Sequence, residues 1–250
     1  MMSLTKVRLW DVVKQQYRYK LKGYIQVFMS MVVLQVLALI FSLNGVGNAG
    51  ASGGLLNVNT SYFSADFVLA FTMLWGFITA ILITTKAYSN DDFIFVTNRL
   101  SSHLSNVLFL VTASILGGLT TILSTFLLKV IVFLFKSDVY LASSADLAAP
   151  MTLLVGVSSA SLYILLLCSL GYLVGTLIQW SKLFAVLLPA VFVGGLLLNA
   201  LSGEAGILAV LYAFFMTESS FPLFFLKVVC TSVVLFWGAF GLSNRLEVRP

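Results

Sequence analysis

The sequence predicts an all-α protein that lies in a membrane, for three reasons. Of its 250 residues, 60% are hydrophobic and only 9% are charged, and the mean hydropathy is +1.05. This composition leaves too little polar surface to cover a soluble globule. The apolar residues also form runs of about 20 residues or more, the length that an α-helix needs to cross roughly 30 Å of hydrocarbon. Because the runs lack the alternation of a transmembrane barrel, we expect helices.

Six apolar runs are predicted to be membrane helices, which together form one transmembrane domain over residues 1–250. They lie at residues 23–43, 67–85, 104–135, 151–179, 183–201 and 221–242. The third is longer than a bilayer requires, so we expect it to tilt or protrude. Gly171 and Gly175 in the fourth have GxxxG spacing, which permits close helix contact. Pro189 should kink the fifth helix.

Three further segments flank or join these runs. Residues 4–22 place apolar side chains at three-to-four spacing beside basic ones, which predicts an amphipathic helix at the membrane surface. Residues 44–62 carry no charge and are rich in glycine. Their GxGxxG pattern lacks the strand and the helix of a dinucleotide site, so we predict a flexible outside loop. Residues 206–215 are too few to cross, which predicts a re-entrant or interfacial element.

The positions of the basic residues predict the orientation of the chain. A cluster of Lys and Arg precedes the first membrane helix, and others lie between helices two and three, between helices four and five, and after the last helix. Lys136 lies in a predicted outside loop. By the positive-inside rule, we expect both termini to be cytoplasmic. We expect the chain to be a multi-pass protein of the plasma membrane. No solvated basic face remains for nucleic acid.

A hydrophilic interruption at residues 86–103 separates the second and third apolar runs. Ser89 or Asn90 can cap a short cytoplasmic helix there, and acidic residues in its first turn suit the positive end of the helix dipole. Such a helix can seat in a groove of a soluble partner. The side chains expected to make this contact are Asp91, Asp92, Phe93, Phe95, Val96 and Arg99. The alternative is an ordinary loop that only joins two helices.

The sequence lacks the residues that intramembrane enzymes need. His103 is the only histidine, and we expect it to be an exposed loop residue at the cytoplasmic boundary. There is no GxxxxGK[ST] loop, so the chain has no P-loop of its own, and we do not expect an enzyme. Cys168 and Cys230 lie in apolar runs without CxxC spacing, so we expect small buried side chains, and neither a metal site nor a redox compartment follows from them.

Few polar side chains fall inside the predicted membrane helices. Lys129 and Lys227 lie toward the outer ends, where they can snorkel to the interface. Alternatively, they line a path for an anionic or amphiphilic substrate, with Asp66 as counter-charge. Gln35 in the first helix can form interhelical hydrogen bonds or belong to a polar stripe in that path.

This order of parts resembles the permease subunits of ATP-binding-cassette transporters of the type-2 exporter family. In that family, an amphipathic elbow helix precedes six membrane helices, a short cytoplasmic coupling helix joins helices two and three, and re-entrant elements lie between helices five and six. The resemblance makes residues 4–22 the elbow helix, residues 91–102 the coupling segment and residues 206–215 the re-entrant element. Residues 96–99 stand where many members carry a Pro-Val-Ser-Arg-like stretch, without its proline.

The resemblance implies a permease that works as a dimer with an identical or homologous chain and with separate P-loop ATPase subunits. Those subunits would bind ATP and Mg²⁺, and this chain would hold no cofactor. Alternating access would move an amphiphilic substrate outward, such as a peptide, a drug or a lipid-like molecule. The alternative function is a membrane-embedded immunity or scaffold protein that binds a partner without transport.

Overall fold

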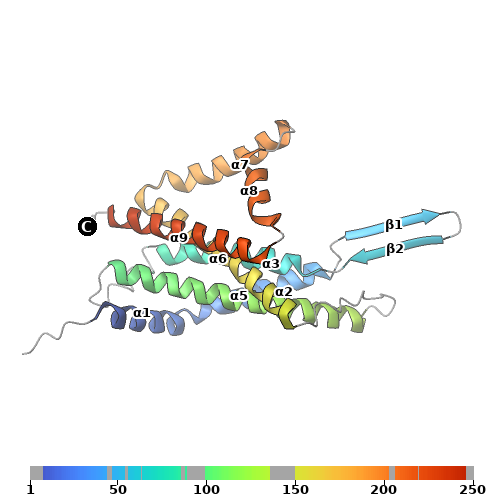
Figure 1. Cartoon of the computed structure of the whole chain (residues 1–250), viewed down its shortest axis with the longest axis horizontal. Helices are drawn as coiled ribbons and strands as arrows, with labels where there is room; N and C mark the ends of the chain where they lie inside the picture. The colour runs from blue at the N-terminus through green and yellow to red at the C-terminus, as the bar shows by residue number, and fades with distance from the viewer. Residues whose placement is uncertain are drawn as a thin grey trace, which may run out of the picture.

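The computed structural model describes residues 8–43, 47–53, 56–62, 64–85, 88, 99–135, 150–202, 206–218 and 220–245. Within these residues the chain forms eight helices and one pair of strands (Figure 1). The helices are α1 (Leu9–Gly23), α2 (Ile25–Ser42), α3 (Asp66–Thr84), α5 (Arg99–Phe135), α6 (Pro150–Trp180), α7 (Phe184–Ser202), α8 (Ile207–Met216) and α9 (Phe221–Arg245). The strands are β1 (Gly47–Gly53) and β2 (Leu56–Tyr62). The predicted helical fold is confirmed.

Five helices are long and apolar enough to cross a membrane, namely α2, α3, α5, α6 and α9. By length and composition, they make the chain a multi-pass membrane protein. The helix α7 is apolar too, but its section at Phe184–Leu197 is shorter than these five. Five of the six predicted membrane helices therefore meet the requirement, and a crossing by α7 stays a prediction.

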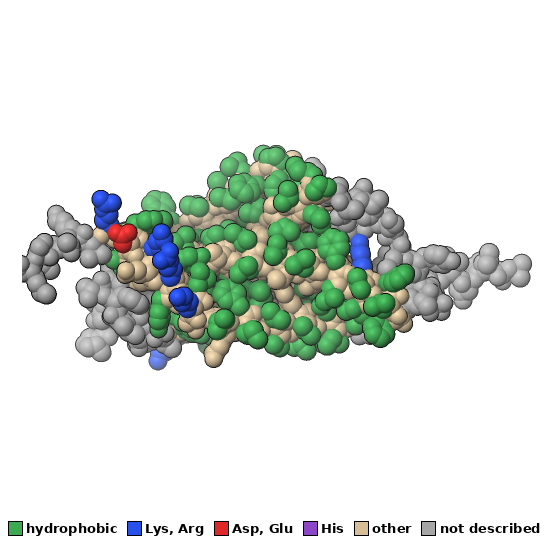
Figure 2. All heavy atoms as spheres, turned by 90° about the horizontal axis from the view of Figure 1, so that it is seen from below, with side chains coloured by type: hydrophobic (Ala, Val, Ile, Leu, Met, Phe, Trp, Pro, Cys, Tyr) green, Lys and Arg blue, Asp and Glu red, His purple; other side chains and the backbone are tan. Residues whose placement is uncertain are grey.

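The helices run back and forth between the two ends of an elongated bundle (Figure 1). Both α1 and the C-terminal end of α9 lie at one end, which we call the α1 end, and the hairpin of β1 and β2 extends from the other (Figure 1). Figure 2 shows hydrophobic side chains over the middle of one face, with Lys and Arg gathered toward the α1 end. An apolar band of this kind suits a bilayer. Which end is cytoplasmic stays a prediction.

The centre of the bundle is α6, which packs against α3, α5 and α9. Its glycines let α3 approach closely. A Cβ atom at Gly171 would overlap the carbonyl oxygen of Phe77, and one at Gly175 would lie 3.1 Å from the Cα atom of Ile81. Because these neighbours are backbone atoms of α3, any side chain would push the two helices apart. The predicted close contact at this GxxxG pair is confirmed.

The helix α1 has one side that is buried in the bundle, which the sequence did not predict. Its buried residues are Val13, Gln16 and Lys20, and it packs against α5. Trp10 is 60% exposed and does not pack inside the bundle, as expected of an apolar side chain that contacts a membrane surface. One side of α1, which includes the polar residues Gln16 and Lys20, therefore faces another helix, and contact of the remaining sides with the membrane surface stays a prediction.

The segment between α2 and α3 was predicted to be a flexible loop, and this prediction is wrong. The strands β1 and β2 pair antiparallel, with Gly47 opposite Tyr62 and Gly53 opposite Leu56. The sequence of β2, Leu-Asn-Val-Asn-Thr-Ser-Tyr, alternates branched or aromatic residues with small polar ones. Such a period of two favours a strand. The high glycine content of β1 is what made the whole segment resemble a loop.

Two predictions for single residues have different outcomes. Cys168 in α6 is buried, as predicted, whereas Cys230 in α9 is exposed, so its predicted burial is wrong. Both are free thiols. An exposed position on an apolar membrane helix faces lipid, which accepts a small thiol as readily as a protein core does. Pro189 lies inside α7, as predicted.

Candidate functional site

The described part of the chain holds two polar regions on α5 and α6. The first is a buried cluster near the α1 end, which we call the His103 network. Its side chains come from three helices: Lys20 of α1, His103, Ser105 and Asn106 of α5, and Tyr172 of α6. None of them is more than 8% exposed. Because water cannot reach their polar atoms freely, these groups have to bond to one another.

The network begins with a buried cation on α1. Lys20 Nζ donates one hydrogen bond to Ser105 Oγ at 2.9 Å and another to Asn106 Oδ1. The amide nitrogen Nδ2 of Asn106 donates to the Tyr172 hydroxyl at 3.3 Å. The three helices α1, α5 and α6 are therefore joined by hydrogen bonds. Lys20 donates to α5, and Asn106 of α5 donates to Tyr172 of α6.

The network ends at a backbone carbonyl of a fourth helix. His103 Nε2 lies 3.1 Å from the carbonyl oxygen of Phe236 in α9, and Nδ1 lies 2.7 Å from the Tyr172 hydroxyl. Because a carbonyl oxygen only accepts, Nε2 carries the proton. In the neutral ring Nδ1 then accepts from Tyr172. Each of these polar side chains forms a hydrogen bond within the bundle, so the network does not provide a binding group for a substrate.

His103 was predicted to be an exposed loop residue, and the structure contradicts this. The helix α5 begins at Arg99, so His103 lies in its second turn and faces the inside of the bundle. The buried positions His103, Asn106, Leu110 and Ala113 recur at three-residue and four-residue spacing. This periodicity predicts a helix that starts before the apolar run. Sequence reasoning missed it because the polar residues were assigned to a loop.

The candidate coupling residues are described only in part. Asp91, Asp92, Phe93, Phe95 and Val96 lie outside the described residues. Arg99 is the first residue of α5. Its Nη1 donates to the carbonyl oxygen of Ser243 at 3.0 Å, near the C-terminal end of α9. A cation at that position suits the negative end of the α9 dipole. Arg99 therefore joins the end of the interruption to α9.

Gln35 is buried between three helices. Its Nε2 donates to Thr72 Oγ1 of α3 at 3.1 Å and to Thr120 Oγ1 of α5 at 2.9 Å. In the same part of the bundle, Trp75 Nε1 of α3 donates to Ser30 Oγ of α2 at 3.0 Å. Both contacts are interhelical hydrogen bonds, the first of the two roles considered for Gln35. A role in a substrate path stays a prediction.

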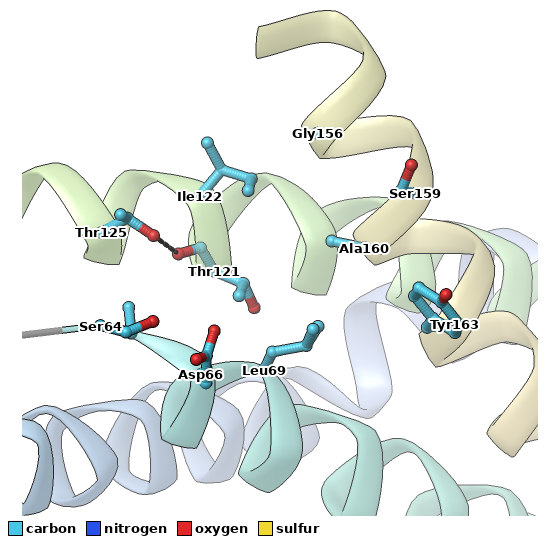
Figure 3. A pocket seen from close by; sticks show the side chains of 11 residues that line it. Ser64, Asp66, Leu69, Thr121, Ile122, Thr125, Gly156, Ser159, Ala160 and Tyr163 are labelled. Carbon is cyan, nitrogen blue, oxygen red and sulfur yellow. Dashed lines mark hydrogen bonds between the residues drawn. The ribbon is translucent and has the colours of Figure 1, made fainter. Parts of the chain in front are cut away.

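The second polar region is a hollow between α3, α5 and α6, which we call the Asp66 hollow (Figure 3). Its volume is about 210 Å³. Its lining consists of Ser64, Ala65, Asp66, Leu69, Thr121, Ile122, Thr125, Gly156, Ser159, Ala160 and Tyr163. Between His103 and Thr121 the helix α5 rises by about 27 Å, at 1.5 Å per residue. The hollow therefore lies well away from the His103 network.

Asp66 is the charged residue of this lining. It is the first residue of α3, and its carboxylate points toward Thr121 across the hollow (Figure 3). Among the described residues, no hydrogen bond or ion pair reaches this carboxylate. The polar atoms near it include the hydroxyl groups of Ser64 and Thr121, whereas the Thr125 hydroxyl donates to the carbonyl oxygen of Thr121 (Figure 3). Asp66 was predicted from the sequence as a counter-charge, whereas the hydroxyl groups around it were not.

The two candidate lysines do not join Asp66 at the hollow. Neither Lys129 nor Lys227 belongs to its lining. Lys227 Nζ forms an ion pair with Glu218 and lies 4.3 Å from the centroid of the Phe214 ring. Both contacts compensate its charge locally. Lys129 is half-buried on α5, one turn beyond Thr125.

Comparisons of the chain with protein-family models, with curated proteins and with solved structures found no match. Within the described residues, no group of three His, Cys, Asp or Glu side chains is placed to hold a metal ion. Inferences about function therefore rest on the bundle itself and on its two polar regions.

Proposed function

We propose that the chain is the transmembrane subunit of an ATP-driven exporter of the ATP-binding-cassette type. It works as a dimer with an identical or homologous chain and with separate ATPase subunits, which bind ATP and Mg²⁺. It moves an amphiphilic substrate outward by alternating access. It has no ATPase site of its own and needs no cofactor.

The observation that carries this proposal is the end of the bundle at which each connection between helices lies. The end of α3, the start of α5 and the C-terminal end of α9 lie at the α1 end (Figure 1). The hairpin and the ten-residue helix α8 lie toward the other end (Figure 1). The two helix ends that the interruption connects, at Thr84 of α3 and Arg99 of α5, thus lie on the same side as the basic helix α1. A soluble ATPase would meet both there.

Two contacts link this side to the inside of the bundle. Arg99 connects the end of the interruption to Ser243 of α9. One turn further along α5, His103 connects α5 to Tyr172 of α6 and to the Phe236 carbonyl of α9. A displacement imposed on the interruption would therefore move α5, α6 and α9 together. Alternating access needs this kind of mechanical connection.

The exposed apolar surface of α7 is the observation that favours a dimer. This helix diverges from the other helices (Figure 1), and around Gly194 it has open space. Its exposed side chains are apolar, with Val186 74% and Val191 64% exposed. A second chain beside α7 would cover this surface. Cross-linking of a Gly194→Cys variant, with Cys168 and Cys230 replaced by alanine, should then yield a covalent dimer in membranes.

Affinity purification in a mild detergent tests the central claim. The chain should recover a P-loop ATPase, and the double variant Phe93→Ala with Phe95→Ala should lose it while inserting normally. The matched control is Phe133→Ala with Phe135→Ala, since both of these aromatic side chains are exposed at the other end of α5. This control should keep the ATPase.

Two results would contradict the proposal. Repeated absence of any ATPase from the wild-type preparation would favour the immunity or scaffold protein, which binds a partner without transport. Equal recovery from both double variants would remove residues 91–99 as the contact. With a recovered ATPase, substrates that stimulate ATP hydrolysis in reconstituted vesicles would define the exported molecule and the direction of transport.

A further inference from the structure

The size of the Asp66 hollow limits what it can hold. Its volume of about 210 Å³ is smaller than the roughly 300–1,000 Å³ of pockets that enclose drug-sized ligands. The hollow has room for one functional group with a short stem. The remainder of any larger ligand would have to lie outside it.

The charge of the lining selects a cation. The Asp66 carboxylate carries a full negative charge, whereas the N-terminus of α3 beside it supplies only about half a positive charge. The net charge of the lining, to which Lys129 does not belong, is therefore negative. The surrounding hydroxyl groups, on Ser64, Thr121 and Thr125 among others, can accept hydrogen bonds. A group that has both a positive charge and several N–H donors satisfies this lining best, and a protonated primary amine is such a group.

The position of the hollow explains where the rest of the ligand would lie. The 19 residues of α3 span about 28 Å, close to the thickness of the hydrocarbon, and Asp66 is the first of them. Asp66 therefore lies at a membrane boundary. Exposed apolar side chains accompany the lining on each of the three helices: Phe67 on α3, Leu123 on α5 and Leu154 on α6. An apolar tail could leave the hollow and run along this surface into the lipid.

We propose that the Asp66 hollow binds the protonated primary amine of an amphiphile, whose apolar tail lies against the bundle in the hydrocarbon. Asp66 forms the ion pair with the amine, and the neighbouring hydroxyl groups accept its other hydrogen bonds. The proposal deepens the proposed function, because it names the class of substrate. The binding step itself needs neither ATP nor a partner chain, so it can be measured on the purified full-length protein.

The test uses a defined probe in a neutral bilayer. The full chain is placed in phosphatidylcholine nanodiscs and titrated with dodecylamine that carries a dansyl group at the far end of the alkyl chain. Fluorescence anisotropy should show saturable binding, and Asp66→Asn should weaken it about tenfold or more, as expected for loss of a charged hydrogen-bond partner. The matched control Asp11→Asn removes an exposed carboxylate at the α1 end and should leave binding unchanged.

A second variant separates the hollow from the charge. A Cβ atom at Gly156 would meet only Ile122 Cδ1, at an ordinary 3.6 Å, so the helix tolerates a side chain there. Gly156→Leu should fill the hollow and reduce binding while Asp66 is still present. Far-UV circular dichroism and size-exclusion chromatography verify that each variant is folded.

Two further binding measurements test whether the charge of the amine is needed and whether the amine belongs to a lipid. The N-acetylated probe, which has no charge, should not bind. Replacing part of the phosphatidylcholine by phosphatidylethanolamine should weaken dodecylamine binding if an aminophospholipid occupies the site, and unchanged binding would assign the site to free amphiphilic amines. Equal binding by wild type and Asp66→Asn, or by the acetylated probe, would overturn the proposal. The outcome is independent of whether an ATPase is recovered.

Discussion

The His103 network and the Asp66 hollow share the helices α5 and α6, yet they treat their charges in opposite ways. In the network, the buried ammonium of Lys20 donates to two side chains, and the chain of bonds continues to a carbonyl of α9. In the hollow, the carboxylate of Asp66 is exposed, and no described side chain bonds to it. The network joins helices, whereas the hollow leaves a charge available.

This difference separates two roles that polar residues can have in a membrane protein. A buried polar group costs free energy unless it is bonded, so a satisfied network indicates a structural connection between helices. A charged group next to an open space is satisfied by solvent or by a ligand. The same helices can therefore supply a structural connection at one end and a binding site at the other.

The largest contrast is expected from one substitution at two glycines of α6. Gly171→Ala places a Cβ atom against the Phe77 carbonyl, which cannot move without shifting α3, so the free energy of unfolding should fall by about 1–3 kcal/mol. Gly156→Ala at the hollow should change it by less than about 1 kcal/mol, and alanine's helix propensity favours a gain. Unfolding by SDS in mixed micelles, followed by circular dichroism, measures both. Equal losses would mean that the two ends are packed alike.

The next contrast uses two tyrosines of the same helix. Tyr172→Phe removes the hydroxyl that joins Asn106 to His103, so both partners lose a bond inside the bundle. We expect a loss of about 1–2 kcal/mol in unfolding free energy. Tyr163→Phe removes a hydroxyl that donates to the Phe215 carbonyl at 3.2 Å in a half-buried position, and about 0.6 kcal/mol is expected. A larger loss of unfolding free energy for Tyr163→Phe than for Tyr172→Phe would contradict the structural role of the His103 network.

A smaller and more local effect is expected at Lys20. Lys20→Met keeps the length of the side chain but removes the donor to Ser105 and Asn106, while it also removes the cost of burying an ammonium. We expect a net loss of about 1 kcal/mol for the docking of α1, seen as roughly fivefold faster hydrogen exchange in α1 alone. Lys14→Met, at an exposed position of the same helix, is the control and should leave exchange unchanged. Unchanged exchange in both variants would show that Lys20 does not hold α1.

Asp66→Asn is expected to have the smallest effect on stability, although it should have a large effect on binding of the amine. Asp66→Asn should change the free energy of unfolding by less than about 0.5 kcal/mol, because the carboxylate is exposed and no described side chain depends on it. The same mixed-micelle unfolding measurement applies. A loss above about 1 kcal/mol would show that Asp66 stabilises the fold, as the His103 network does, and would contradict its assignment as a group available for a ligand.

The sequence predicted the membrane helices well, because their apolar runs have nearly the length of the helices. The run at 151–179, for example, became α6 at Pro150–Trp180, and its glycine pair was found where α3 approaches. Composition and run length are local properties, so a single sequence contains them. The strands β1 and β2 also left a local signal in the alternation of β2, which the abundance of glycine concealed.

The polar regions were predicted less completely, because their contacts are far apart in the sequence. His103 bonds to Tyr172, 69 residues away, and to the carbonyl of Phe236, 133 residues away. No property of residues 99–106 alone indicates these partners. Asp66 could be selected from the sequence as a charge at a helix end, but the hollow depends on how α3, α5 and α6 pack. Lys20 belongs to the basic cluster before the first membrane helix, which was used only to predict orientation, and its burial was not predicted.

The length of α5 has a thermodynamic consequence. Its 37 residues extend for about 55 Å, and the same rigid element carries His103 near one end and lines the Asp66 hollow toward the other. If the bundle has two arrangements that differ in the position of α5, a ligand that prefers one of them shifts the equilibrium for the whole helix. Linkage is reciprocal: an amphiphile in the hollow would change the affinity of a partner at the α1 end by the same factor by which that partner changes the affinity for the amphiphile.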